Sequence, residues 1–163
     1  MKFRQVEDLR RHATALRQTL EQAFSADTAY GGSLPGLPSA GHCAVVAAIA
    51  YSRFGGSLLS TNIAGQSHWF NRVRVGADLV DVDLTGDQFG GPAVRLAPAG
   101  RLYADSRVRV PQEVTPETRA RTKLLVSRAG LAIQSRPLEH PSQREKRDLV
   151  GVDSVRPRRI RQS

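Results

Sequence analysis

The sequence predicts an α+β fold in which a buried helix packs against a small antiparallel sheet. Two observations carry this prediction: residues 43–54 are almost entirely apolar and alanine-rich, and several short β-rich segments follow between residues 58 and 84. Amphipathic segments at residues 3–24 and 116–130 add a helix on either side. At 163 residues the chain has the length of a single domain and can bury a core.

The first predicted helix covers residues 3–24, where apolar side chains recur every three or four positions. These positions are Phe3, Val6, Leu9, Ala13, Leu16, Leu20 and Phe24. Glycines and prolines mark residues 25–42 as a loop. A loop of this length is unusual without a function, so we expect it to form one wall of a cleft.

The buried helix at residues 43–54 is predicted to stop at Gly55-Gly56. Strands are expected at residues 58–62, 67–75 and 79–84, the last two joined by a turn at residues 76–78. A fourth strand is expected within residues 102–110. The helix at residues 116–130 has Thr115 as a candidate N-cap, with Pro116 at its first position.

The charge of the chain is uneven. The formal net charge is +9, yet residues 1–97 carry nine basic and eight acidic side chains. Residues 136–163 carry eight basic and four acidic side chains and no aromatic residue. We therefore expect a single domain at residues 1–135, with its core at 25–97, followed by a basic disordered tail at 136–163. This tail is expected to be a solvated segment or a weak electrostatic arm for nucleic acid or another acidic partner.

Composition also argues against several classes of protein. One cysteine allows no internal disulfide and no multi-cysteine metal site. No apolar run approaches the roughly 20 residues of a membrane span, and the N-terminus has no apolar signal core. A cytoplasmic protein without a membrane partner is expected. We also expect no cofactor and no metal, since adjacent ligands such as His42 and Cys43 rarely close a tetrahedral site.

Three residue types in a fixed order predict nucleophilic chemistry. Cys43 is expected at the start of the buried helix, where the helix dipole and free N–H groups favour negative charge on sulfur and on an attacked carbonyl oxygen. His68 opens a strand and is the candidate general base and acid. Asp83, late in the next strand, is the candidate group that orients the imidazole. With a turn at 76–78, Asp83 falls two or three residues short of His68, a gap that a small register shift would close.

Three further residues are candidate auxiliary groups. His42 precedes Cys43, and as its immediate neighbour it is a poor general base for that thiol. Gln66 lies just before His68 and could line the cleft. Asn71 shares the strand with His68, but the two-residue period of a strand places it on the opposite face.

The segments around these residues resemble the small bacterial YunG family, and more broadly papain-like and transglutaminase-like cysteine enzymes. The family pattern stands here as Gly41-His42-Cys43-Ala44-Val45, Phe54-Gly55-Gly56, Gly65-Gln66-Ser67-His68-Trp69-Phe70-Asn71 and Val82-Asp83-Leu84-Thr85-Gly86-Asp87-Gln88-Phe89. One departure is His42, where the family usually has glutamine. The resemblance implies a papain-like or transglutaminase-like core and thiol attack on an acyl carbon.

The expected function is therefore a cysteine-dependent amide or ester hydrolase or acyltransferase that works through a thioester. Hydrolysis and acyl transfer use the same residues, so the sequence leaves both open. A second reading is a catalytically silent binding module of the same fold, whose basic C-terminal part contacts an acidic partner. The substrate is not identified by the sequence.

Overall fold

A computed structural model describes residues 1–32 and 36–132 of the chain. Within this part the protein has a mixed α+β fold, as predicted. The elements are α1 (Val6–Glu21), α2 (Cys43–Phe54), β1 (Ser57–Ile63), β2 (Gln66–Val75), β3 (Asp78–Asp83), η1 (Gly86–Phe89), β4 (Arg95–Pro98), β5 (Arg107–Arg109), η2 (Pro111–Glu113) and α3 (Pro116–Arg128). The tail expected at 136–163 lies outside the described residues.

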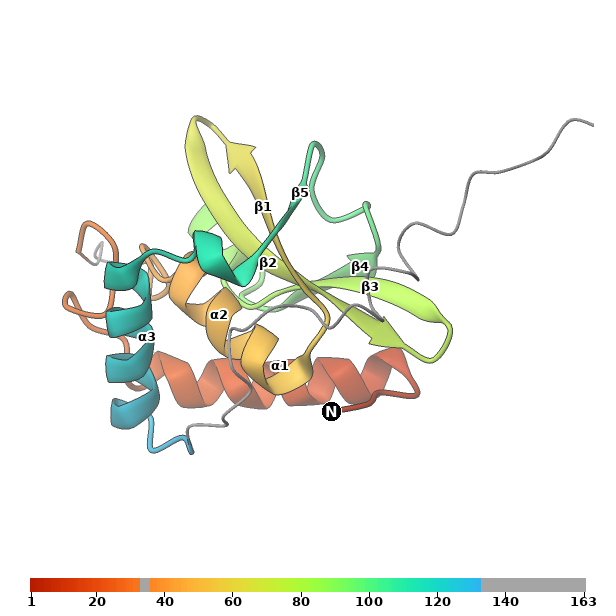
Figure 1. Cartoon of the computed structure of the whole chain (residues 1–163), viewed down its shortest axis with the longest axis horizontal. Coiled ribbons are helices and arrows are strands. Elements are labelled where there is room, and N and C mark those ends of the chain that lie inside the picture. The colour runs from red at the N-terminus through yellow and green to blue at the C-terminus, as the bar shows by residue number, and fades with distance from the viewer. Residues whose placement is uncertain (33–35, 133–163) are drawn as a thin grey trace, which may run out of the picture.

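The strands form one antiparallel sheet in the order β4-β3-β2-β1-β5. In Figure 1, α1 and α2 lie on one side of this sheet, and α3 packs against α2. The main core lies between these helices and the inner face of β2 and β3. Its members include Leu9, Leu16, Leu20, Val46, Ile49, Val73, Val80 and Val82.

Helix α1 is shorter than the predicted 3–24 because both ends of the pattern belong to neighbouring structure. Phe3 lies before the helix and forms a bridge with Val75 of β2. The core-facing positions of α1 are otherwise as predicted, but Arg17 is also buried, with only 3% of its surface exposed. Its guanidinium group binds the carboxylate of Asp87 in η1 and the carbonyl of Leu84. An interior cation therefore ties α1 to the segment that follows β3.

Helix α2 has the bounds predicted from its apolar run. It ends at Gly55, whose φ of +77° is accessible to glycine and disfavoured for residues with a side chain. Its start is fixed by Gly41, which has φ +73° and packs against the backbone of Tyr30 so closely that a Cβ would collide with the Tyr30 carbonyl. Gly41 also accepts a hydrogen bond from the Tyr30 N–H, so these two residues of the loop are held together.

The connection between β2 and β3 differs from the prediction by one residue. Val75 pairs with Asp78, so the turn contains only Gly76 and Ala77, and β3 begins at Asp78. The predicted fourth strand exists only as β5, three residues long. The sequence pattern missed β4, an edge strand of four residues without alternating burial, which is too short to leave a periodic signal.

None of the helices in residues 1–32 and 36–132 is both long enough and apolar enough to cross a membrane.

Candidate active site

Cys43 is the first residue of α2 and is partly exposed. Its Sγ atom lies 3.9 Å from the backbone carbonyl oxygen of Ser67, at the start of β2. The thiol thus lies where the N-terminal end of α2 approaches the second strand. The first amide groups of a helix have no intrahelical acceptor, so this position offers free N–H groups and the positive end of the helix dipole.

The next residue along β2, His68, is almost fully buried. Its Nε2 atom forms a hydrogen bond of 2.9 Å with Oδ2 of Asp83 at the end of β3. Because a carboxylate only accepts, Nε2 carries the proton. The other ring nitrogen, Nδ1, has no hydrogen-bond partner among the described residues. Burial lowers the pKa of the imidazole, whereas Asp83 and the nearby Cys43 thiol raise it.

Asp83 is fixed by more than the histidine. Its Oδ1 atom accepts hydrogen bonds from the backbone N–H and the hydroxyl of Thr85, at 2.8 and 3.0 Å. Its Oδ2 atom also accepts a bond of 2.5 Å from the hydroxyl of Tyr103. Four donors therefore surround a carboxylate that is only 1% exposed. They compensate for the loss of water and keep both oxygens in place.

The electrostatics of this arrangement favour a protonated imidazole. Burial of His68 disfavours the charged ring, but its hydrogen bond to Asp83, its interaction with the Cys43 thiol and the charges of both groups outweigh this effect. Together they raise the pKa of His68 to about 9. At neutral pH the ring is then a cation beside the sulfur, and a cation in this position stabilises negative charge on a thiol. Burial next to Asp83 also raises the pKa of Tyr103, so its phenol remains a donor.

Aromatic rings enclose the histidine. Phe89 and Tyr103 meet it edge to face at centroid distances of 4.8 and 5.2 Å, and Phe70 stacks at 6.5 Å. This cage excludes water from the His68–Asp83 bond and limits rotation of the ring. The electrostatic contacts inside it are therefore stronger than they would be in water.

His42, a candidate auxiliary group of the site, lies in the interior behind the start of α2. Its ring is completely buried, stacks on Phe24 at 4.1 Å and faces away from the site. Nδ1 lies 3.0 Å from the Ala40 carbonyl and Nε2 lies 2.9 Å from the Thr28 hydroxyl. Burial lowers the pKa of His42, and because the Ala40 carbonyl only accepts, Nδ1 carries a proton and donates it to this contact. This residue fastens the loop to the start of α2.

The structure does not bring Asn71 to the thiol either. Its buried amide donates a 3.0 Å hydrogen bond to the Ala47 carbonyl in α2, on the helix side of the sheet. Gln66 is exposed at the first position of β2, one residue before Ser67. Of the predicted residues, the structure thus brings together Cys43, His68 and Asp83. The described residues contain no cluster of three or more His, Cys, Asp or Glu side chains that could hold a metal ion.

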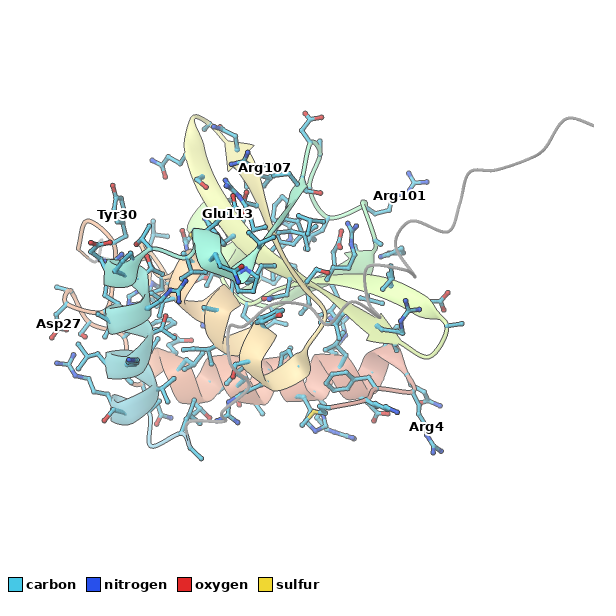
Figure 2. The ribbon with its side chains drawn as sticks, in the orientation of Figure 1. Arg4, Asp27, Tyr30, Arg101, Arg107 and Glu113 are labelled. Carbon is cyan, nitrogen blue, oxygen red and sulfur yellow. The ribbon has the colours of Figure 1, made fainter. Side chains whose placement is uncertain are left out.

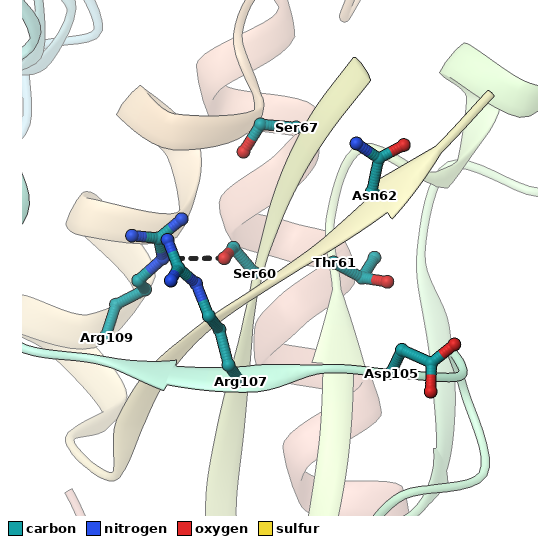
Figure 3. Close-up of a pocket in the computed structure, with 7 residues that line it drawn as sticks. All are labelled: Ser60, Thr61, Asn62, Ser67, Asp105, Arg107 and Arg109. Atoms are coloured by element: carbon teal, nitrogen blue, oxygen red, sulfur yellow. Dashed lines mark hydrogen bonds between the residues drawn. The ribbon is translucent and has the colours of Figure 1, made fainter. Parts of the chain in front are cut away.

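A pocket of about 280 Å³ lies near the start of β2. Figure 3 shows its lining, which comes from β1, the start of β2, and β5 with the loop before it: Ser60, Thr61, Asn62, Ser67, Asp105, Arg107 and Arg109. Ser67 belongs to both features, because its carbonyl contacts the Cys43 thiol. The described residues of the loop at 25–42, which was expected as a cleft wall, do not line this pocket; Ser39 lies against η1, where its carbonyl accepts a hydrogen bond from Gln88.

Sequence reasoning missed Tyr103 and Thr85 as partners of Asp83. For Thr85 there was a local signal, since an Asp followed two residues later by a hydroxyl residue favours an Asx-type turn. Tyr103 lies 20 residues beyond Asp83 in an irregular segment, and no periodic pattern links the two. Only the fold brings them together.

Comparison with known proteins shows the family of the chain. The model of the YunG protein family matches residues 12–133. The match covers most of the chain, including all three residues of the site, so the protein belongs to the YunG family. Searches of curated proteins and of solved structures returned no match.

Proposed function

We propose that this protein is a thiol-dependent acyl hydrolase or acyltransferase with a papain-like or transglutaminase-like catalytic arrangement. One observation carries the proposal: the buried His68 imidazole donates from Nε2 to Asp83 and leaves Nδ1 without a partner among the described residues, and Asp83 and Cys43 raise its pKa despite this burial. This is the order nucleophile, base, orienting group that activated nucleophiles require. In these roles Cys43 is the nucleophile, His68 the general base and acid, and Asp83 the orienting residue.

The reaction then follows from the positions of the groups. The proton of the Cys43 thiol resides on Nδ1 of the cationic His68 ring, and the sulfur attacks the carbonyl carbon of an amide or ester. The free N–H groups at the start of α2 support the oxyanion that forms. When it collapses, the bond to the amine or alcohol breaks, that group leaves with the proton from His68, and a thioester remains. Water or an amine, deprotonated by His68, attacks the thioester and releases Cys43.

The active-site thiol can be tested without knowing the substrate, because Cys43 is the only cysteine. We expect iodoacetamide to alkylate it at slightly acid pH about tenfold or more faster than an unstructured cysteine peptide, since adjacent cations activate thiols. A His68→Gln variant should lose this advantage. His12→Gln is the matched control, because His12 is a histidine of α1 that contacts the Asp8 carbonyl.

Two outcomes would contradict the proposal. One is a thiol no faster than the peptide, which would favour the silent binding module. The other is a His68→Gln variant that reacts as fast as the wild type while circular dichroism shows it folded. The binding reading also places a partner on the basic residues 136–163, which lie outside the described part of the chain.

A further inference from the structure

Two arginines of the edge strand β5 line the pocket near the start of β2. Arg107 and Arg109 alternate along the strand, so their side chains leave the same face of the sheet. In Figure 3 both guanidinium groups lie at the Ser60 end of the pocket, while Asp105 lies at the other end. Two cations at one end of a small pocket repel each other unless an anion lies between or near them.

Arg109 is held rigidly. Its Nε atom donates a 2.7 Å hydrogen bond to the Ser60 hydroxyl, and Nη1 donates one of 2.7 Å to Glu113. The guanidinium group also lies over the Trp69 ring, 5.2 Å from its centroid. Glu113 therefore balances the charge of Arg109, and the remaining contacts fix its orientation.

Arg107 has no direct partner of this kind. Its side chain is exposed, and within residues 1–32 and 36–132 it forms no hydrogen bond or ion pair. The pKa of Glu113 is lowered mainly by its bond from Arg109 and further by the charge of Arg107, so both arginines share this one carboxylate. The surplus positive charge of this end of the pocket thus rests on Arg107. An unpaired guanidinium group offers a planar set of donors that matches a carboxylate or a phosphate.

Neutral donors complete the pocket. Because the Ser60 oxygen accepts from Arg109, its own hydrogen is left to donate. The Asn62 side chain accepts from the Gly65 N–H through Oδ1, so its amide hydrogens also remain available. Both residues line the pocket together with the arginines. Fixed donors of this kind bind an oxyanion with little reorganisation.

Ser67 connects the pocket with the site of the thiol. Ser67 lines the pocket, and its carbonyl oxygen lies 3.9 Å from Sγ of Cys43. A small compound whose acyl carbon lies at the sulfur can therefore extend an anionic group toward Arg107. The volume of about 280 Å³ suits a small group rather than a folded partner.

From this geometry we propose that the pocket lined by Ser60, Asn62, Arg107 and Arg109 is a subsite for the carboxylate or phosphate group of a small acyl substrate. That the bound compound is a substrate rests on the proposed thiol chemistry. Anion binding by the pocket does not depend on that chemistry. It assigns to the protein a substrate class, an amide or ester that carries an anionic oxygen group.

The first experiment compares two alkylating reagents that differ in charge. Iodoacetate is anionic and iodoacetamide is neutral, so the ratio of their rates with Cys43 measures attraction of an anion to the site. We expect this ratio to exceed that of N-acetylcysteinamide by about fivefold, and Arg107→Gln to lower it toward the model compound. The matched control is Arg4→Gln, because Arg4 is exposed and lies at the opposite end of the molecule from Arg107 (Figure 2).

An Arg107→Gln variant that keeps the wild-type ratio would overturn the subsite. If wild-type Cys43 reacts with both reagents no faster than the model compound, the proposed thiol chemistry is contradicted instead. The subsite is then tested by a binding measurement. That measurement titrates a Cys43→Ala variant with inorganic phosphate or acetate at constant ionic strength, and follows the amide resonances of β1 and β5 by NMR. We expect saturable shifts that Arg107→Gln weakens about tenfold, an effect typical of removing a charge-assisted contact.

The two anions distinguish the sources of the same chemistry. Tighter binding of phosphate assigns a phosphate ester to the subsite, and tighter binding of acetate assigns a carboxylate. Absence of saturable shifts with both anions would overturn the proposal, even if Cys43 proves reactive.

Discussion

His68 and Asp83 form a 2.9 Å hydrogen bond although they are not opposite each other in the sheet. The β2–β3 ladder pairs Asn71 with Val82, so one further step places Asp83 opposite Phe70. His68 lies two residues beyond Phe70 on the same face, a diagonal neighbour of Asp83. Diagonal positions are about 7–8 Å apart, within reach of a histidine and a carboxylate together. The aromatic cage and the two hydroxyl donors to Asp83 keep this diagonal contact in one geometry.

The raised pKa of His68 makes stability depend on pH. The folded protein holds the proton up to about pH 9, whereas an unfolded histidine releases it near 6.5. The stabilisation is thus complete below about pH 6.5 and is lost as the pH rises toward 9. We expect the free energy of unfolding to fall by roughly 2–3 kcal/mol across this window. Urea titrations at several pH values measure it, and a curve for His68→Gln with the same slope would contradict the assignment.

Replacing Asp83 by asparagine tests the orienting group. Asn can still accept from Nε2, but it removes the charge that supports the imidazolium, and the burial that disfavours the charged ring remains. We expect the pKa of His68 to fall, and alkylation of Cys43 at neutral pH to slow by about tenfold or more. NMR titration and iodoacetamide kinetics report the two effects. Asp78→Asn, at the exposed start of the same strand, should change neither.

Tyr103 provides a second test of how Asp83 is held. Tyr103→Phe keeps the ring against His68 and Phe70 but removes the hydrogen bond to the buried carboxylate. Because hydrogen bonds to charged groups are strong, we expect the free energy of unfolding to fall by about 1–3 kcal/mol. Without the Tyr103 hydroxyl, Oδ2 of Asp83 accepts from His68 alone. This favours the charged imidazole, so the pKa of His68 should rise further. An unchanged stability together with an unchanged titration would show that this bond contributes nothing.

Local patterns predicted the parts of the fold that depend on local physics. The bounds of α2 follow from an uninterrupted apolar run that ends at two glycines, and the alternation of β2 and β3 places Asp83 on the face of His68. The turn is one residue shorter than predicted, because turns of Gly76-Ala77 and of Gly76-Ala77-Asp78 are both compatible with the sequence. Nothing local could show that the buried ring of His42 binds Thr28, or that Tyr103 returns to Asp83.

Substitution of His42 separates an auxiliary catalytic role from a structural one. His42→Gln removes the stacking on Phe24 and disturbs the contacts with Thr28 and Ala40, so we expect a loss of roughly 1–3 kcal/mol in stability. The pH profile of Cys43 alkylation should keep its shape, because the ring does not face the thiol. If the midpoint of the alkylation pH profile moves in a folded His42→Gln variant, His42 acts on the thiol and has an auxiliary role.

The buried cation of α1 is the last test, and it concerns the support of the site. Arg17→Met removes the bonds to Asp87 and to the Leu84 carbonyl, and leaves the Asp87 carboxylate with Ser39 as its remaining side-chain donor. Breaking one side of a buried ion pair costs about 3–5 kcal/mol, so we expect a loss of this size in the free energy of unfolding. Arg11→Met on the exposed face of the same helix should cost roughly 0.5 kcal/mol or less.

The double variant Arg17→Met with Asp87→Asn distinguishes an unpaired charge from lost packing. If the cost comes from the stranded carboxylate, neutralising Asp87 should restore part of the stability that Arg17→Met removes. Chemical denaturation of the two single variants and the double variant gives this coupling directly. Costs that simply add would mean that Arg17 stabilises the protein through its bond to the Leu84 carbonyl and its packing, and not through the ion pair.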